Sequence, residues 1–289
     1  MGFLDEFREA MYDGDPTIRE WFLIKSNFWP PFLSCMYLLT IKVIGPYFMR
    51  NRKPYELRKI MAFYNLFLVV TYLIALVTFI YNLKNLNTMK LCEISRVSRQ
   101  DATYVMATCG WVVYLLKYVE FFDTIFFVLR KKDHMITNLH VIHHGSLPLC
   151  GWMLFRTERT GIQGFPTMLN SMVHTVMYFY YFLAALGPSI RKYLWWKRYL
   201  TILQMTQFII IFIFATVITP LAGCSARKSS IYIHVFTAVV FFILFYNFYR
   251  HSFKPTKSHQ NGISKREKHE DKCSNGKVMN GHATKIKSN

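Results

Sequence analysis

The sequence contains few cysteines and few acidic residues for its length. Its 289 residues include 6 cysteines, none of them in a Cys-x-x-Cys pair, and no Asn-x-Ser/Thr sequence for glycosylation occurs. The small number of cysteines argues against a scaffold built from disulfides and against a structural zinc site. Asp and Glu total 16 against 35 Lys and Arg, which gives a formal net charge of +19. Any fold assigned to the chain must keep this excess of positive charge in contact with water or with anionic partners.

Long apolar runs make up much of the remaining sequence. Hydrophobic residues account for 53% of the chain, and the basic residues fall between the apolar runs and in the C-terminal tail. A soluble domain is seldom both so apolar and so basic. A hydrocarbon core of about 30 Å needs roughly 20 apolar residues in a helix. Runs of this kind occur at 29–49, 60–82, 104–129, 136–155, 165–187, 199–222 and 231–249. The sequence therefore predicts an all-α, polytopic membrane protein with seven transmembrane helices; a six-span alternative stays open because prolines and Lys42 weaken the first run.

The loops between these runs predict how the chain sits in the membrane. The alternate loops 50–59, 130–135 and 188–198 carry more Lys and Arg than the longer loops between them. Because Lys and Arg accumulate on the cytosolic side, we expect a lumenal N-terminal segment at 1–28 and a cytosolic tail at 251–289. The tail is polar and without apolar periodicity, which predicts disorder. Attraction to anionic lipid accounts for its charge better than nucleic acid, and its last five residues resemble a lysine signal for return to the endoplasmic reticulum.

Two cysteines, Cys92 and Cys224, fall in loops that this topology assigns to the lumen. The lumen is oxidising, and we predict a disulfide between them. Two free thiols are the alternative.

Polar side chains lie inside four of the predicted spans, where they are energetically expensive and usually face a cavity. At about 1.5 Å per residue, they reach similar depths in the cytosolic half of the bilayer. Each type has an alternative structural role, since single amides often join helices, tyrosines form interfacial belts, and a lysine can pair with a glutamate. Three histidines within five residues are not required for helix packing. The candidates are Lys117, Glu120, Asp123, Thr124, His140, His143, His144, Asn170, His174, Met177, Tyr178, Tyr181, Thr201, Gln204 and Gln207.

Two kinds of chemistry fit such a cluster. His140 and His144 are four residues apart on a helix, which suits metal ligation as in membrane di-iron desaturases and hydroxylases. Such sites need about eight histidines, and few of the ten in this chain fall at the right depth. A buried neutral imidazole can instead attack a thioester, and the resulting acyl-imidazole would survive in a dry cavity. The sequence therefore favours acyl transfer, with metal-dependent lipid oxidation as the alternative.

In order and spacing, these residues resemble the four signature motifs of the fatty acid elongases. The motifs read Lys117-x-x-Glu120-x-x-Asp123-Thr124, His140-x-x-His143-His144, Asn170 with His174-x-x-Met177-Tyr178, and Thr201-x-x-Gln204-x-x-Gln207. The resemblance covers roughly residues 30 to 250 and implies a seven-span elongase domain at 29–250, in which six helices form an inverted barrel around an acyl tunnel. It also implies a very-long-chain 3-oxoacyl-CoA synthase of the endoplasmic reticulum. Such an enzyme joins long-chain acyl-CoA to malonyl-CoA, with loss of carbon dioxide and CoA and without a cofactor.

The resemblance also implies roles for individual residues. His143 is the expected nucleophile, and His174 is its partner. His140, His144, Glu120 and Asp123 would set tautomers and charge around them. Residues expected to bind substrate are Lys117, Asn170, Tyr178, Tyr181, Gln204 and Gln207, with Lys197 and Arg198 as contacts for CoA phosphates. The family suggests further partners, namely the ketoreductase, dehydratase and enoyl reductase of the elongation cycle and a second copy of the chain. The preferred length of the acyl chain stays open.

Overall fold

The computed structural model describes residues 8–9, 11–12, 14–85, 102–157, 163–224 and 226–253. All regular secondary structure in these residues is helical. The chain divides into two compact units, the first ending at Phe248 and the second beginning at Tyr249. The first unit contains every described candidate site residue. The predicted tail at 251–289 lies outside the described residues from 254 onward.

The observed helices follow the predicted apolar runs to within a few residues. The apolar runs form helices because backbone groups that lack water must hydrogen-bond within their own segment, and the helices end where charged or turn residues follow. The elements are α2 Pro16–Arg19, α3 Trp29–Leu39, η1 Thr40–Ile44, α4 Gly45–Met49, α5 Arg58–Asn85, α7 Ala102–Val119, α8 Phe121–Leu129, η2 Asp133–Met135, α9 Asn138–Thr157, α10 Gly164–Leu186, α11 Pro188–Arg191, α12 Lys197–Ile213, η4 Phe214–Ile218, α13 Thr219–Leu221 and α14 Lys228–Phe253.

Four of these helical stretches are long and apolar enough to cross a membrane. They are Trp29–Met49, Arg58–Asn82, Lys197–Leu221 and Lys228–Phe253. Many of their large apolar side chains are exposed, as expected for helices that face lipid. The protein is therefore a multi-pass membrane protein. Two further points stay predictions. One is that the segments 102–129, 138–157 and 164–186 also cross the membrane, and the other is that six helices close an inverted barrel.

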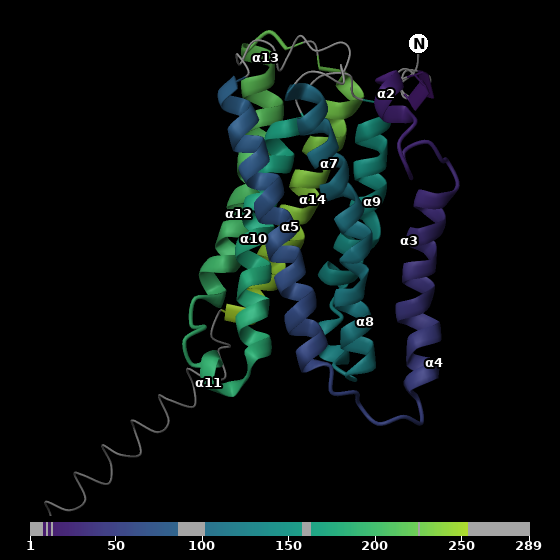
Figure 1. Ribbon diagram of the computed structural model, residues 1–289, viewed down its shortest axis with the longest axis vertical. Helices are drawn as coiled ribbons and strands as arrows, with labels where there is room; N and C mark the ends of the chain where they lie inside the picture. The colour runs from purple at the N-terminus through teal and green to yellow at the C-terminus, as the bar shows by residue number, and fades with distance from the viewer. Residues whose placement is uncertain are drawn as a thin grey trace, which may run out of the picture. The chain divides into compact units, whose positions relative to one another are not determined.

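The helices pack side by side, with α10 against both α5 and α12, and α7 against both α5 and α9 (Figure 1). The π-helix η1 joins α3 to α4, and α3 lies along α9 at the edge of the first unit (Figure 1). Leu68, Tyr72 and Tyr178 are fully buried in the core between α5, α7, α10 and α12. A second apolar cluster, around Phe208 and Phe241, joins α12 and α10 to α14. The candidate site lies between these two apolar clusters.

One predicted helix is interrupted in the structure. The sequence predicts a continuous helix over 104–129, but α7 ends at Val119 and α8 begins at Phe121. The residue between them, Glu120, has φ −62° and ψ −13°, and its carbonyl accepts a hydrogen bond from the Asp123 amide, three residues on. This is the tighter 3₁₀ pattern, which favours short stretches at helix ends. The prediction of one unbroken helix was wrong because it treated Glu120 as an ordinary helical position, whereas tertiary contacts hold its side chain.

A proline follows each π-helix after one intervening residue. η1 is followed by Gly45-Pro46, and η4 by Thr219-Pro220. A proline ring inside a helix clashes with the carbonyl four residues earlier and donates no hydrogen bond. A wider turn before the proline relieves this clash, which is how α3 and α12 continue into α4 and α13.

Candidate active site

Glu120 connects side chains from four helices, α5, α7, α9 and α10. Lys117 Nζ donates to Glu120 Oε1 at 3.1 Å, and the Tyr72 hydroxyl donates to the same oxygen. His174 Nδ1 lies 3.0 Å from Glu120 Oε1, and His144 Nδ1 lies 3.8 Å from Glu120 Oε2. Glu120 is 0% exposed and its four partners are also buried. A carboxylate so deeply buried requires these partners, because desolvation of an unpaired charge costs several kcal/mol.

Two polar atoms at the centre of this network have no hydrogen-bond partner within the described part of the chain. They are Glu120 Oε2 and His144 Nδ1, which face each other at 3.8 Å. Buried polar atoms are nearly always paired, and exceptions often lie at functional sites or beside water. These two unpaired atoms therefore mark this point of the network as a candidate functional position.

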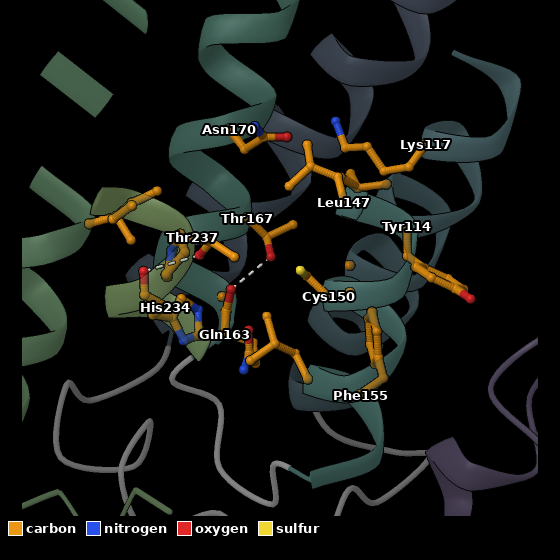
Figure 2. A pocket seen from close by; sticks show the side chains of 18 of the residues that line it. Tyr114, Lys117, Leu147, Cys150, Phe155, Gln163, Thr167, Asn170, His234 and Thr237 are labelled. Carbon is orange, nitrogen blue, oxygen red and sulfur yellow. Dashed lines mark hydrogen bonds between the residues drawn. The ribbon is translucent and has the colours of Figure 1, made fainter. Parts of the chain in front are cut away.

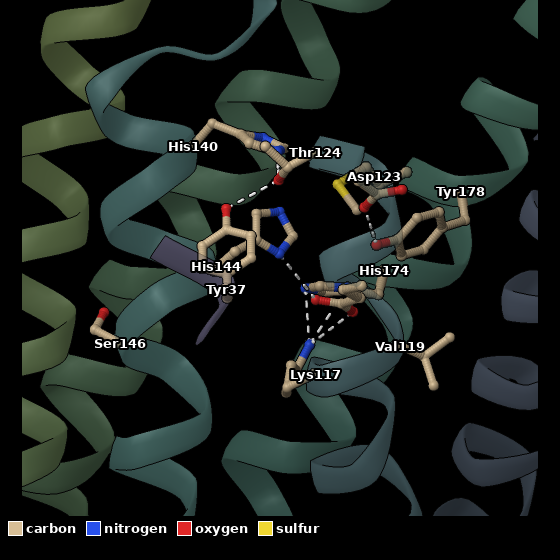
Figure 3. A network of polar contacts seen from close by, with 12 residues as sticks. Tyr37, Lys117, Val119, Asp123, Thr124, His140, His144, Ser146, His174 and Tyr178 are labelled. Carbon is tan, nitrogen blue, oxygen red and sulfur yellow. Dashed lines mark hydrogen bonds and ion pairs between the residues drawn. The ribbon is translucent and has the colours of Figure 1, made fainter. Parts of the chain in front are cut away.

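A second set of hydrogen bonds lies beside the first (Figure 3). The Thr124 hydroxyl is 2.8 Å from His140 Nε2 and 2.9 Å from the Tyr37 hydroxyl on α3. The rings of His140 and His144 are 4.4 Å apart, so the second set touches the first. The hydroxyl of Thr124, rather than a carboxylate, thus orients the His140 imidazole.

Asp123 and Tyr178 form a separate pair. The Tyr178 hydroxyl donates to Asp123 Oδ2 at 2.8 Å, and the Tyr178 ring stacks on Tyr72 with centroids 6.1 Å apart. This pair supports the network around Glu120 through ring packing and does not share a hydrogen bond with it among the described residues.

His143 lines an apolar cavity. The cavity has a volume of about 220 Å³, and Lys117, Asn170 and Gln207 also line it. The His143 ring packs against Phe241 with centroids 5.1 Å apart. Figure 2 shows Lys117 and Asn170 at one end and Phe155 and Gln163 at the other. Lys117 takes part in both the cavity and the Glu120 network, so it joins the two.

The remaining predicted residues lie outside this arrangement. Gln204 Nε2 donates to the sulfur of Met177 at 3.2 Å, and Tyr181 packs its ring against Tyr178. Lys197 and Arg198 are exposed at the start of α12 and are not among the described residues that line the cavity.

Cys224 is in a disulfide bond. Its predicted partner, Cys92, lies outside the described residues, so the pairing of these two cysteines stays a prediction.

The sequence reasoning missed two tyrosines of the site, Tyr72 and Tyr37. Tyr72 lies within an otherwise mostly apolar run of α5 and is 0% exposed, while Tyr37 lies on α3 and is 3% exposed. A buried tyrosine hydroxyl usually finds a hydrogen-bond partner. A tyrosine within a long apolar run was therefore the available signal, although α5 contains three tyrosines and the signal does not identify the partner.

The alternative of a metal centre gains no support from the geometry. Within the described ranges, no three His, Cys, Asp or Glu side chains are placed so that they could hold a metal ion. The pair that the sequence suggested as metal ligands, His140 and His144, packs ring against ring, and the His140 imidazole hydrogen-bonds to Thr124.

The fold and the site define a class, namely helical multi-pass membrane proteins in which a buried Lys–Glu–His network adjoins an apolar cavity. Residues 22–261 match the ELO family, described as the GNS1/SUR4 family. The chain belongs to this family.

Curated relatives agree with the family match. A very long chain fatty acid elongase of Aedes aegypti is 38% identical over 267 residues, which cover 89% of this chain and 72% of that protein. Very long chain fatty acid elongase 7 of Rattus norvegicus is 35% identical, covering 89% of this chain and 93% of its own length. Very long chain fatty acid elongase 1 of Mus musculus is 35% identical, covering 87% and 90%. The family and these relatives assign the chain to fatty acid elongation.

Proposed function

We propose that this chain is the condensing enzyme of fatty acid elongation, a very-long-chain 3-oxoacyl-CoA synthase that works through an acyl-histidine intermediate. The observation that carries the proposal is that His143 lines an apolar cavity together with Lys117, Asn170 and Gln207. An imidazole that borders an apolar space is suited to attack a long-chain acyl thioester. The surrounding donors suit the negative charge that develops on the carbonyl oxygen.

In the first half-reaction, a ring nitrogen of neutral His143 attacks the thioester carbon of the acyl-CoA. The carbon–sulfur bond breaks, the thiolate takes the imidazole proton, and free CoA leaves while the acyl group stays on the ring. Amide groups of Asn170 and Gln207, which line the same cavity, are the candidate donors to the oxyanion. The apolar walls keep water from the acyl-imidazole, which would otherwise hydrolyse.

In the second half-reaction, malonyl-CoA loses carbon dioxide and its electron pair moves into an enolate. The enolate carbon attacks the acyl carbon, the bond to His143 breaks, and the ring nitrogen takes from the solvent a proton that replaces the one lost with CoA. The product is a 3-oxoacyl-CoA two carbons longer. Lys117 borders the cavity from within the Glu120 network, so its ammonium is suited to stabilise the enolate or the departing carboxylate.

His174 and His144 act on this chemistry through Glu120. Their Nδ1 atoms face the two carboxylate oxygens, at 3.0 Å for His174 and 3.8 Å for His144, and the shorter contact orients the His174 ring and its proton. In this proposal the Glu120 network holds Lys117 in place and supplies a path for the proton.

The proposal also covers the contacts to CoA, the membrane in which the protein lies and its protein partners. Lys197 and Arg198, exposed at the start of α12, are suited to the phosphates of CoA. The uneven loop charges support an endoplasmic reticulum membrane protein with a lumenal N-terminus and a cytosolic C-terminus. The reductases and the dehydratase of the elongation cycle, and a second copy of the chain, are its proposed protein partners.

Intact-protein mass spectrometry tests the intermediate. Purified protein incubated with acyl-CoA alone should gain the mass of one acyl group, and later addition of malonyl-CoA should remove that mass and release carbon dioxide. The variant His143→Ala should gain no mass and release no carbon dioxide. A matched control is His134→Ala, because His134 is exposed on η2 and outside the cavity lining. Acylation that persists in His143→Ala and disappears in another histidine variant would contradict the choice of nucleophile, and absence of condensation by the wild-type protein would contradict the function.

A further inference from the structure

The N-terminal segment 14–28, called the strap here, reaches the end of the cavity that lies away from His143. Ile18 of the strap lines the cavity and is 9% exposed. It packs in one apolar cluster with Tyr114 and Phe155, which line the same cavity. His143 and Phe155 are both on α9, and the helical rise of 1.5 Å per residue separates them by about 18 Å. The strap therefore covers the cavity at the end opposite the proposed nucleophile.

Arg156, at the end of α9, holds the strap in this place. Its Nε donates to the Ile24 carbonyl at 2.8 Å, and one Nη donates to the Lys25 carbonyl at 2.9 Å and also to the Asn27 side chain. Arg156 is 4% exposed. A buried guanidinium that donates to three acceptors on one segment fixes the path of that segment, because separation would leave a buried charge without partners.

Tryptophans and a close backbone contact add to this attachment. Trp111 Nε1 on α7 donates to the Phe22 carbonyl at 3.0 Å, and Trp152 Nε1 on α9 donates to the Ile24 carbonyl at 3.3 Å. A Cβ atom on Gly14 would lie 2.2 Å from the Arg156 carbonyl oxygen, so the strap backbone lies directly on α9 there. These contacts come from two of the helices that form the cavity wall.

The N-terminal cap of α2 fixes the direction of the Ile18 side chain. The Asp15 carboxylate caps α2 by accepting from the amides of Thr17, at 2.8 Å, and Ile18, at 3.2 Å. Asp15 is 1% exposed, so the cap is not replaced by solvent. The first turn of α2 thus presents the Ile18 side chain to the cavity in a fixed orientation.

We infer that the strap is the floor of the acyl-binding cavity and that Ile18 is a specificity-determining residue for acyl chain length. The inference rests on the proposed function. An acyl chain that extends from His143 along the apolar cavity passes Tyr114, which lies partway along it in Figure 2, and meets Ile18 and Phe155 toward its methyl end. The volume of the residue at position 18 then sets the longest chain that is accepted.

The test uses the full chain, malonyl-CoA and a series of saturated acyl-CoAs of even length. Ile18→Ala should shift the longest efficient substrate upward, and Ile18→Trp should shift it downward. One methylene in an apolar pocket changes kcat/KM by roughly 10–200-fold, so the ratio of kcat/KM between adjacent even lengths should change by at least about tenfold. Ile18→Val and Ile18→Phe change the side-chain volume less and should shift the longest efficient substrate in the same two directions. They test the inference if Ile18→Ala or Ile18→Trp reduces expression.

Leu23→Ala is the matched control, because Leu23 is buried in the same strap and cluster but is not among the described residues lining the cavity. It should keep the wild-type length profile. Ile18 variants with an unchanged profile, or with shifts in the same direction for smaller and larger side chains, would overturn the inference. A different result would contradict the proposed function, namely that the wild-type protein forms no 3-oxoacyl-CoA from acyl-CoA of any chain length.

Discussion

At the scale of single residues, the central question is what the buried pair of Lys117 and Glu120 does. The sequence leaves two roles open, an ion pair that holds helices together and a part of the chemistry. The structure gives both residues further contacts, since Lys117 lines the cavity and Glu120 faces two histidines. A buried pair contributes little net stability, but removal of one member leaves an uncompensated charge. The two roles therefore predict different results for single and double variants.

Glu120→Gln should lower the unfolding free energy by about 3–5 kcal/mol, because Lys117 then lacks its counter-charge. Addition of Lys117→Met should restore most of that stability, since no buried charge remains from the pair. Turnover should stay at least about 100-fold below wild type in both variants, because the ammonium and the carboxylate also serve the reaction. Thermal unfolding in detergent and carbon dioxide release measure the two effects.

The exposed pair of Lys25 and Glu20 provides the matched control for this cycle. Its Nζ and Oε2 atoms are 2.6 Å apart and its side chains are 69% and 67% exposed. Lys25→Met with Glu20→Gln should change stability by less than about 1 kcal/mol. Recovery of turnover together with stability in the Lys117→Met/Glu120→Gln variant would assign the buried pair a structural role alone.

At the scale of elements, the interruption between α7 and α8 determines which side chains meet. Glu120 lies at the break and binds residues from other helices, while Asp123 and Thr124 on α8 bind Tyr178 and His140. Because successive residues of a helix are about 100° apart, the rotation of α8 relative to α7 sets all of these contacts. The break is thus part of the construction of the site.

Insertion of one alanine after Val119 should abolish turnover while the helical content stays close to wild type. The insertion rotates the following helix by about 100° and moves Glu120 away from Lys117. Circular dichroism and carbon dioxide release measure the two properties. An alanine inserted after Lys53, in the connection between α4 and α5 that contains no helix, is the control and should keep turnover. Retained turnover after the Val119 insertion would show that the register between α7 and α8 is unimportant.

At the scale of the whole molecule, the orientation in the membrane decides which end of the cavity the substrates enter. The proposed topology gives the His143 end to the cytosol, where acyl-CoA and malonyl-CoA would arrive, and the strap end to the lumen. In intact microsomes, protease should therefore remove an epitope tag at the C-terminus and leave a tag at the N-terminus protected. Cleavage of the N-terminal tag without detergent would contradict this orientation.

Much of the fold was predictable because it depends on local chemistry. Apolar runs long enough to span a membrane form helices wherever their backbone groups lack other partners, and the bounds of α5, α10 and α12 follow those runs. The candidate residues were also predictable, since His143 and Glu120 are out of place in a purely structural apolar helix. Neither inference requires knowledge of which helices are neighbours.

The sequence by itself determined a multi-pass helical protein and the motif residues of a fatty acid elongase, because hydropathy, spacing and residue type are properties of short segments. Only the tertiary structure decided that Glu120 interrupts a helix to meet Tyr72 and that Arg156 holds a strap about 130 residues away in sequence. Such contacts depend on the rotation and approach of whole helices. Those quantities result from packing across the molecule and leave no trace in local spacing.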